Sequence, residues 1–115
     1  MNLEFKTKKL RKQCEDPRIA QKIFGSGIGT KLTLRINEFR AAVNLKDIEK
    51  NRVVNGFHQL DGDRKKEFAV TLKHPHRLIF TINSEESNDE EISYSDIEFV
   101  RIEEVIDYHG KNKAK

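Results

Sequence analysis

The chain has 115 residues, a formal net charge of +3, and equal shares, 36% each, of apolar and charged residues. A chain of this length forms one domain and buries about two-thirds of its unfolded surface, so it needs no disulfide or metal staples. Its single cysteine, Cys14, excludes an intramolecular disulfide and a cysteine-rich zinc site. The sequence shows neither a membrane-spanning apolar run nor an apolar signal-peptide segment. We therefore expect one cytoplasmic domain over residues 1–115.

The first half of the chain predicts one short strand followed by two or three helices. Residues 2–7 alternate apolar and polar side chains as a strand does, and the basic stretch 8–16 predicts a helix. Asp16 followed by Pro17 predicts a new helix, because aspartate caps free amides and proline is tolerated at the first helical position. Asn44 is a candidate cap for one more short turn over residues 45–50.

The strongest periodic signal lies between these two caps. Apolar residues recur at helical spacing and form one predicted face: Ile28, Leu32, Ile36, Phe39 and Val43. Basic residues are predicted on the opposite side: Lys31, Arg35 and Arg40.

After Asn51 the apolar spacing changes to two, which predicts a sheet. A strand over 57–60, a turn at 61–63 and a strand over 67–73 predict a hairpin, and a second turn at 73–76 leads into the next strand. On that strand three residues are predicted to face the core, namely Leu78, Phe80 and Ile82. Three others are predicted on the opposite face, namely Arg77, Ile79 and Thr81.

A last strand is predicted over residues 97–108, either central in the sheet or bulged near Glu103 and Glu104. The predicted fold is α+β. A short N-terminal strand precedes two or three helices, which pack on one face of a curved, mainly antiparallel sheet of four to five strands.

Charge is distributed unevenly along the chain. Residues 84–98 hold seven of the 19 acids and no Lys or Arg, so all 22 basic residues lie elsewhere. We expect 84–96 to form an acidic loop and 110–115 a basic, frayed tail. A basic body with one acidic loop points to a polyanionic partner. Surface charge that only keeps the protein soluble is the alternative interpretation.

The sheet face away from the helices is predicted to be uncovered, and side chains suited to phosphodiester chemistry fall on it. His58, Tyr108 and His109 offer groups for proton transfer, and Arg77 offers a cation for charge developing on phosphorus. Basic residues near the turns are candidate RNA- or phosphate-binding groups: Arg64, Lys65, Lys66 and Lys73. Each also has a structural explanation, such as a surface hydrogen bond for His58 or an ion pair with a neighbouring glutamate for Arg77.

Two other patterns are weaker. The glycine-rich stretch 25–29 looks like a nucleotide-binding loop, but it follows a predicted helix rather than a strand. His74 and His76 flank a proline, and no third metal ligand is evident near them in the sequence. We therefore expect no metal and no cofactor.

One segment and the end of the last strand resemble a known family. The run FHQLDGDRKKEFAVTLKHPHRLIF, residues 57–80, is similar to the hairpin core of RelE/ParE-superfamily toxins, specifically the HigB-like killer proteins of type II toxin-antitoxin systems. Asp107, Tyr108 and His109 are similar to their DYH ending, and RINEFRAAVNLKDI, residues 35–48, is of their style. The resemblance spans most of residues 16–109, and it implies a RelE-like fold.

The resemblance also implies a function. Such toxins are cytosolic, metal-independent endoribonucleases (mRNA interferases) that cut messenger RNA held on the ribosome, with the 2′-hydroxyl of the RNA as nucleophile. By position, His58 would transfer a proton or orient the RNA, Arg77 would stabilise the transition state, and Arg64 and Lys65 would bind phosphate. Tyr108 or His109 would orient the 2′-hydroxyl or protonate the leaving oxygen. The implied partners are the ribosome, mRNA and a helix-turn-helix antitoxin.

The sequence departs from this family at Asp61, where HigB-like members often have lysine, and a carboxylate there repels phosphate. Two alternatives follow: a non-catalytic ParE-like gyrase inhibitor, and a ribosome- or RNA-binding module that has lost cleavage. The acidic loop would contact the antitoxin, mimic nucleic acid or simply be solvated.

Overall fold

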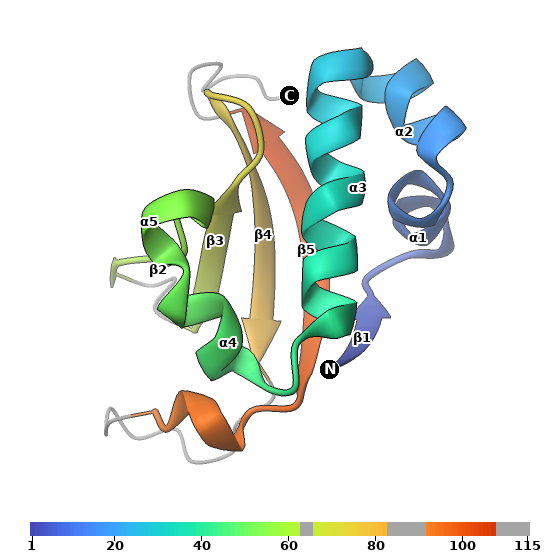
Figure 1. Ribbon diagram of the computed structural model, residues 1–115. Helices are drawn as coiled ribbons and strands as arrows, with labels where there is room; N and C mark the ends of the chain where they lie inside the picture. The colour runs from blue at the N-terminus through green and yellow to red at the C-terminus, as the bar shows by residue number, and fades with distance from the viewer. Residues whose placement is uncertain (63–65, 83–91, 108–115) are drawn as a thin grey trace.

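The computed structural model describes residues 1–62, 66–82 and 92–107, and these form one α+β unit (Figure 1). The elements, in chain order, are β1 (Asn2–Phe5), α1 (Lys8–Glu15), α2 (Pro17–Phe24), α3 (Ser26–Ala41), α4 (Leu45–Lys50), α5 (Arg52–Asn55), β2 (His58–Gln59), β3 (Glu67–Thr71), β4 (His76–Ile82), the short 3-10 helix η2 (Tyr94–Asp96) and β5 (Phe99–Asp107). Within the described ranges, no helix has the length and apolar character needed to cross a membrane.

The five strands form one mixed sheet in the order β1-β5-β4-β3-β2. The N-terminal strand β1 runs parallel to β5, and the other neighbouring pairs are antiparallel. The register between β4 and β5 shifts between Ile79 and Phe80, so that Ile79 faces Glu104 while Phe80 faces Ile102. Glu103 is therefore the extra residue of a bulge. Of the two predicted alternatives for the last strand, a place inside the sheet or a bulge near Glu103 and Glu104, both apply, because β5 also lies between β1 and β4.

Side-chain caps start the helices where the sequence predicts them. The Asp16 side chain accepts a hydrogen bond from the backbone N–H of Arg18, and Pro17 takes the first helical position of α2. Asn44 caps α4 in the same way through the N–H of Lys46. These polar residues satisfy amides that a helix start leaves free, and each fixes where its helix begins.

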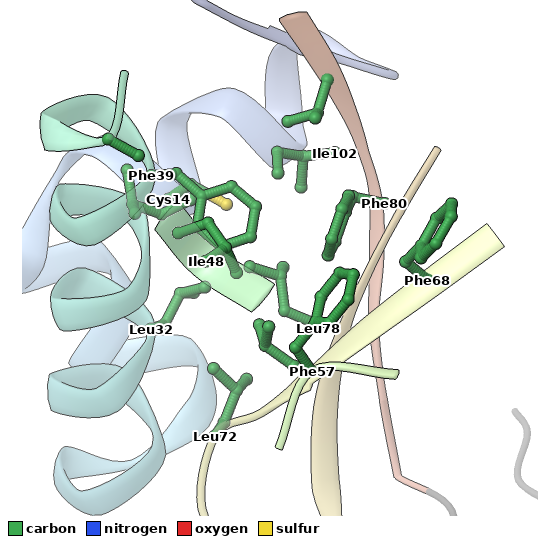
Figure 2. Packing of buried hydrophobic residues seen from close by; sticks show 14 of the residues in the cluster. Cys14, Leu32, Phe39, Ile48, Phe57, Phe68, Leu72, Leu78, Phe80 and Ile102 are labelled. Carbon is green, nitrogen blue, oxygen red and sulfur yellow. The ribbon is translucent and has the colours of Figure 1, made fainter. Parts of the chain in front are cut away.

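The core lies between the helices and one face of the sheet, called here the inner face (Figure 2). Aromatic rings form its centre: Phe39 of α3 meets Phe80 of β4 edge-on at a centroid distance of 5.0 Å. Phe68 of β3 stacks on Phe57 at 5.6 Å and on Phe80 at 5.7 Å. Helices α1 to α4 all contribute buried residues to this one cluster. The predicted α+β architecture, with helices packed on one face of the sheet, is confirmed.

Helices α2 and α3 cross at a glycine. A Cβ atom built on Gly29 would lie 2.7 Å from the Cα of Gln21, which is closer than real Cβ contacts come. The backbones of the two helices can approach this closely only because Gly29 has no side chain. Of the glycines in the stretch 25–29, Gly27 and Gly29 lie inside α3, whereas Gly25, at φ 91°, separates α2 from α3.

Several details differ from the sequence-based expectation. The described residues contain five α-helices instead of two or three. The additional helices α4 and α5 are each only a turn or so long, which is too short for a periodic apolar pattern to reveal them. Helix α5 stands just after Asn51, where strand spacing was expected to begin. Part of the predicted acidic loop forms η2, and residues 84–91 of that loop and the basic tail 110–115 lie outside the described residues.

The predicted faces of α3 are wrong at two positions. Val43 is 70% exposed, because α3 ends at Ala41 and the helical spacing no longer applies beyond it; Ala42 is buried in its place. Arg35 is buried rather than solvent-facing. It lies three residues after Leu32 and four before Phe39, so helical geometry puts it on the same stripe as these core residues.

Candidate active site on the outer face of the sheet

The register brings His58 and Arg77 onto the outer face of the sheet, which points away from the helices. The neighbours of Ala69 and Thr71 along β3 belong to the core cluster, so these two residues point outward. His58 lies directly opposite Ala69, and Arg77 lies directly opposite Thr71. Opposed residues on antiparallel strands share a face. Strand β3 separates the two candidates, and sheet geometry puts their Cα atoms about 12 Å apart.

His58 is exposed, and its ring is held on one side by the chain itself. Its Nδ1 lies 3.0 Å from the carbonyl oxygen of Gly56. A carbonyl oxygen can only accept, so this hydrogen bond requires the proton on Nδ1. In the neutral ring the lone pair is then on Nε2, which is the nitrogen able to take a proton from a bound molecule.

Gly56 has a conformation and a neighbour that require glycine. It ends α5 with φ 72°, in the left-handed region, and its N–H donates to the carbonyl of Arg52 at 2.8 Å. A Cβ atom at this position would lie 2.2 Å from the Thr71 hydroxyl oxygen. The segment that carries His58 therefore lies directly against the end of β3. Sequence analysis did not single out Gly56, although a glycine two residues before the candidate histidine was the available signal.

Arg77 is half-buried, and it faces Thr71 on one side and Ile106 of β5 on the other. Half-burial between two neighbouring strands limits the directions its guanidinium can take, and a cation so restricted can be aimed at a bound phosphate. Tyr108 and His109, the other two predicted catalytic residues, lie outside the described residues. The structure thus brings together two of the four.

The outer face is not bare, which corrects the sequence-based expectation. Ala69 and Ile79, neighbours across β3 and β4, are both fully buried although neither belongs to the core cluster on the inner face. Residues in central strands have neighbours on both sides of the same face, so a sheet face without helices does not by itself leave its central residues exposed. An uncovered face was inferred because the helices were predicted on the other side of the sheet, and that placement does not determine the exposure of individual residues on this face.

The two predicted phosphate-binding residues that the structure describes, Lys66 and Lys73, do not lie together. Lys66 precedes β3 and Lys73 follows it, so the two lie roughly 20 Å apart at opposite ends of the strand. Lys73 extends over the first turn of α3, where its Nζ would lie 3.0 Å from a Cβ atom on Gly27. Lys66 is exposed on the same hairpin as His58, as is Asp61. Arg64 and Lys65 lie outside the described residues.

The described part of the outer face carries more acids than bases. Its glutamates are Glu4, Glu67, Glu103 and Glu104, and its arginines are Arg77 and Arg101. Glu103 accepts a hydrogen bond from the Thr81 hydroxyl at 2.9 Å, and its Oε2 lies 3.7 Å from Arg101 Nε. Glu67, Glu103 and Glu4 lie toward the start of β3 and disfavour phosphate there. Glu104 faces Ile79, in the same cross-strand row as Ala69 and His58.

The other predicted chemistry stays outside this site. Nε2 of His76, the first residue of β4, lies 3.9 Å from Oδ2 of Asp107, the last residue of β5. Among the residues that the structure describes, no three His, Cys, Asp or Glu side chains are grouped to hold a metal ion. Cys14 is buried in the core, and burial raises the pKa of its thiol to about 12, with a further contribution from Glu15.

Among solved structures, the chain is similar to a YoeB/ParE toxin from Agrobacterium tumefaciens, with 15% sequence identity and a TM-score of 0.42. The alignment covers 93% of this chain and 94% of that chain. No family model and no curated protein matches the sequence. At this identity and TM-score the likeness bears on neither activity nor partners, which depend on the residues of this chain.

Proposed function

We propose that this protein is the toxin of a type II toxin-antitoxin pair, a HigB-like member of the RelE/ParE superfamily, and that it cleaves mRNA on the ribosome without a metal ion. The observation that carries the proposal is the fixed imidazole of His58. Its Nδ1 is bound to the Gly56 carbonyl, so Nε2 is the proton acceptor, and Arg77 shares its face of the sheet. A base that removes the proton of a hydroxyl nucleophile, and a cation that stabilises negative charge on the phosphoryl oxygens, are the two groups that attack at phosphorus needs.

The reaction follows from these two groups. His58 Nε2 takes the proton of the RNA 2′-hydroxyl, and the 2′-oxygen attacks the adjacent phosphorus. The bond from phosphorus to the 5′-oxygen breaks, which leaves a 2′,3′-cyclic phosphate and a 5′-hydroxyl. Arg77 stabilises the extra negative charge on the phosphoryl oxygens in the transition state. The family resemblance assigns protonation of the leaving oxygen to Tyr108 or His109.

The ribosome is the proposed source of substrate alignment. The described outer face carries four glutamates and two arginines, so its electrostatic attraction for free RNA is weak. A substrate already held in place needs less binding from the enzyme, since alignment alone contributes many orders of magnitude to a rate. Free RNA should therefore be a poor substrate, and ribosome-bound mRNA a good one.

The antitoxin is proposed to contact the helical side of the molecule. Val53 is 94% exposed and Val54 is 75% exposed, both on α5. Val54 also lines a hollow of about 380 Å³ between α3, α4 and α5. Two adjacent exposed valines beside a hollow are typical of a protein contact. An antitoxin bound there would leave the outer face of the sheet uncovered.

A purified translation system tests the proposal. The wild-type protein is added to a defined mRNA with and without ribosomes, and the cleaved ends are analysed for a 2′,3′-cyclic phosphate. Cleavage only with ribosomes, leaving that end, is the expected result. If a folded protein leaves the mRNA intact in both samples, the endonuclease proposal is wrong, and a DNA gyrase supercoiling assay then tests the ParE-like alternative.

A further inference from the structure

Arg35 is a buried charged residue that the proposed reaction does not use. It lies on α3 among core residues, and the residue is only 3% exposed. Burying a charge is costly unless its hydrogen bonds are made. Its Nε donates to the backbone carbonyl of Thr71 at 2.8 Å, and its Nη1 lies 3.1 and 3.3 Å from the two carboxylate oxygens of Glu38. The hydrogen bond to Thr71 connects α3 to the end of β3 in the sheet.

The carbonyl that Arg35 binds lies where the backbone pairing of β3 stops. Strand β2 pairs with Phe68 and Ala69 only. The carbonyl of Glu67 accepts from Leu60, on the β2 side. Backbone groups alternate in direction along a strand, so the carbonyl of Thr71 also points to that side, beyond the last β2 pair. The guanidinium of Arg35 supplies the donor there.

Thr71 contacts both candidate catalytic residues, directly or through one residue. It lies opposite Arg77 in the pairing of β3 with β4. Its hydroxyl also lies against Gly56, whose carbonyl holds the His58 ring. A displacement of the end of β3 would therefore move both Arg77 and the support of His58.

We propose that Arg35 is a positioning residue for this site: it fixes the end of β3, and through Thr71 it sets the placement of His58 and Arg77. The part of this inference that concerns catalysis rests on the proposed function. Arginine suits the role because its planar fork binds a carbonyl and a carboxylate at the same time, and Glu38 holds that fork in place. Lysine offers a single point charge and cannot reproduce both contacts at fixed geometry.

Two substitutions and one matched control test the proposal. Arg35→Met keeps the length and the apolar stem but removes every donor, and Arg35→Lys keeps the charge without the fork. Arg40→Met removes an arginine from the same helix at an exposed position, where its Nη2 binds Glu15 Oε2 at 2.6 Å. The control changes the net charge by the same amount and makes no contact with β3 among the contacts described.

The first measurement needs neither ribosomes nor RNA. Nitrogen-15 NMR of the His58 ring and of the Arg77 guanidinium is recorded for the folded free variants. We expect both sets of signals to move in Arg35→Met and to stay in place in Arg40→Met. Unchanged His58 and Arg77 signals in a folded Arg35→Met protein would overturn the proposal. This result stands even if the wild type cleaves no mRNA, so the two proposals fail separately.

The second measurement is cleavage of ribosome-bound mRNA. A misplacement of about an ångström costs on the order of 10²-fold in rate, so Arg35→Met should lower kcat by that factor with KM changed less than about twofold. Arg35→Lys, which loses part of one hydrogen-bond network, should lose roughly tenfold in kcat. If Arg35→Met does not fold, Arg35→Lys decides: wild-type kcat and wild-type His58 signals in that variant would overturn the proposal.

Discussion

Gly56 and Thr71 touch so closely that no side chain fits between them: a Cβ atom on Gly56 would lie 2.2 Å from the Thr71 hydroxyl oxygen. This contact joins the segment that carries His58 to the strand that faces Arg77. The candidate site thus depends on a backbone approach that a single methyl group would prevent.

Gly56→Ala should therefore lower the free energy of unfolding by about 2–4 kcal/mol, through left-handed strain and the clash with Thr71. Gly62→Ala is the matched control, because Gly62 has φ 67° and nothing within 4 Å of its Cβ position. It should lose only about 1 kcal/mol, the strain alone. Urea unfolding of both variants measures the difference. Equal losses would show that the Thr71 contact has no energetic role.

A second pair of glycines tests the crossing of α2 and α3. Gly29→Ala places a methyl group 2.7 Å from the backbone of Gln21, so it should cost about 1–3 kcal/mol. Gly27→Ala meets only the flexible end of Lys73, and alanine favours the helix, so stability should rise by about 0.5 kcal/mol. Thermal unfolding followed by circular dichroism compares them. A stable Gly29→Ala variant would contradict the close crossing.

The antitoxin contact can be tested on α5. Val53→Asp together with Val54→Asp should weaken antitoxin binding at least about tenfold, because two charges would replace the centre of an apolar contact. The fold should tolerate the change, since both side chains are exposed. Ile23→Asp on α2, at a residue 53% exposed, is the control and should bind normally. Titration calorimetry with the antitoxin, to be sought among the products of neighbouring reading frames, gives the affinities. Unchanged affinity in the double variant would place the antitoxin elsewhere.

The buried thiol of Cys14 predicts a pH dependence at alkaline pH. Burial raises its pKa from 9.0 to about 12, so in the folded protein the thiol stays protonated while the unfolded chain ionises. The protonated thiol therefore contributes stability below pH 9 that is lost as pH rises from 9 through about 12. Cys14→Ala lacks this contribution, and the difference in unfolding free energy between the two proteins should shrink over that range. A constant difference would contradict the burial of the thiol.

Local chemistry explains which parts of the fold could be predicted from the sequence. Asp16, Pro17 and Asn44 act on backbone amides within a few residues, so the helix starts at 17 and 45 follow from nearest neighbours. The hairpins and the bulge at Glu103 likewise follow from turn residues and from a break in the alternation.

Long-range packing explains what could not be predicted. The burial of Ala69 and Ile79, on a sheet face without helices, is a matter of tertiary packing, and the separation of Lys66 from Lys73 depends on the length and direction of β3. Arg35 is a different case, because its spacing from Leu32 and Phe39 did indicate the buried stripe. Its charge favoured the solvent side. Its burial is compensated by Glu38 and by a carbonyl 36 residues away, that of Thr71, and the second partner could not be found from local sequence.

The measurement that tests the central claim most directly is cleavage of ribosome-bound mRNA by four single alanine variants. His58→Ala and Arg77→Ala remove the proposed base and cation. As controls, His74→Ala removes an exposed histidine from the turn before β4, and Arg101→Ala removes an exposed arginine from the other end of the outer face, beside Glu103. With all four proteins folded, the first two should lose on the order of 10²- to 10³-fold in rate, and the last two should stay within about twofold of the wild type. Wild-type cleavage by His58→Ala would contradict the account.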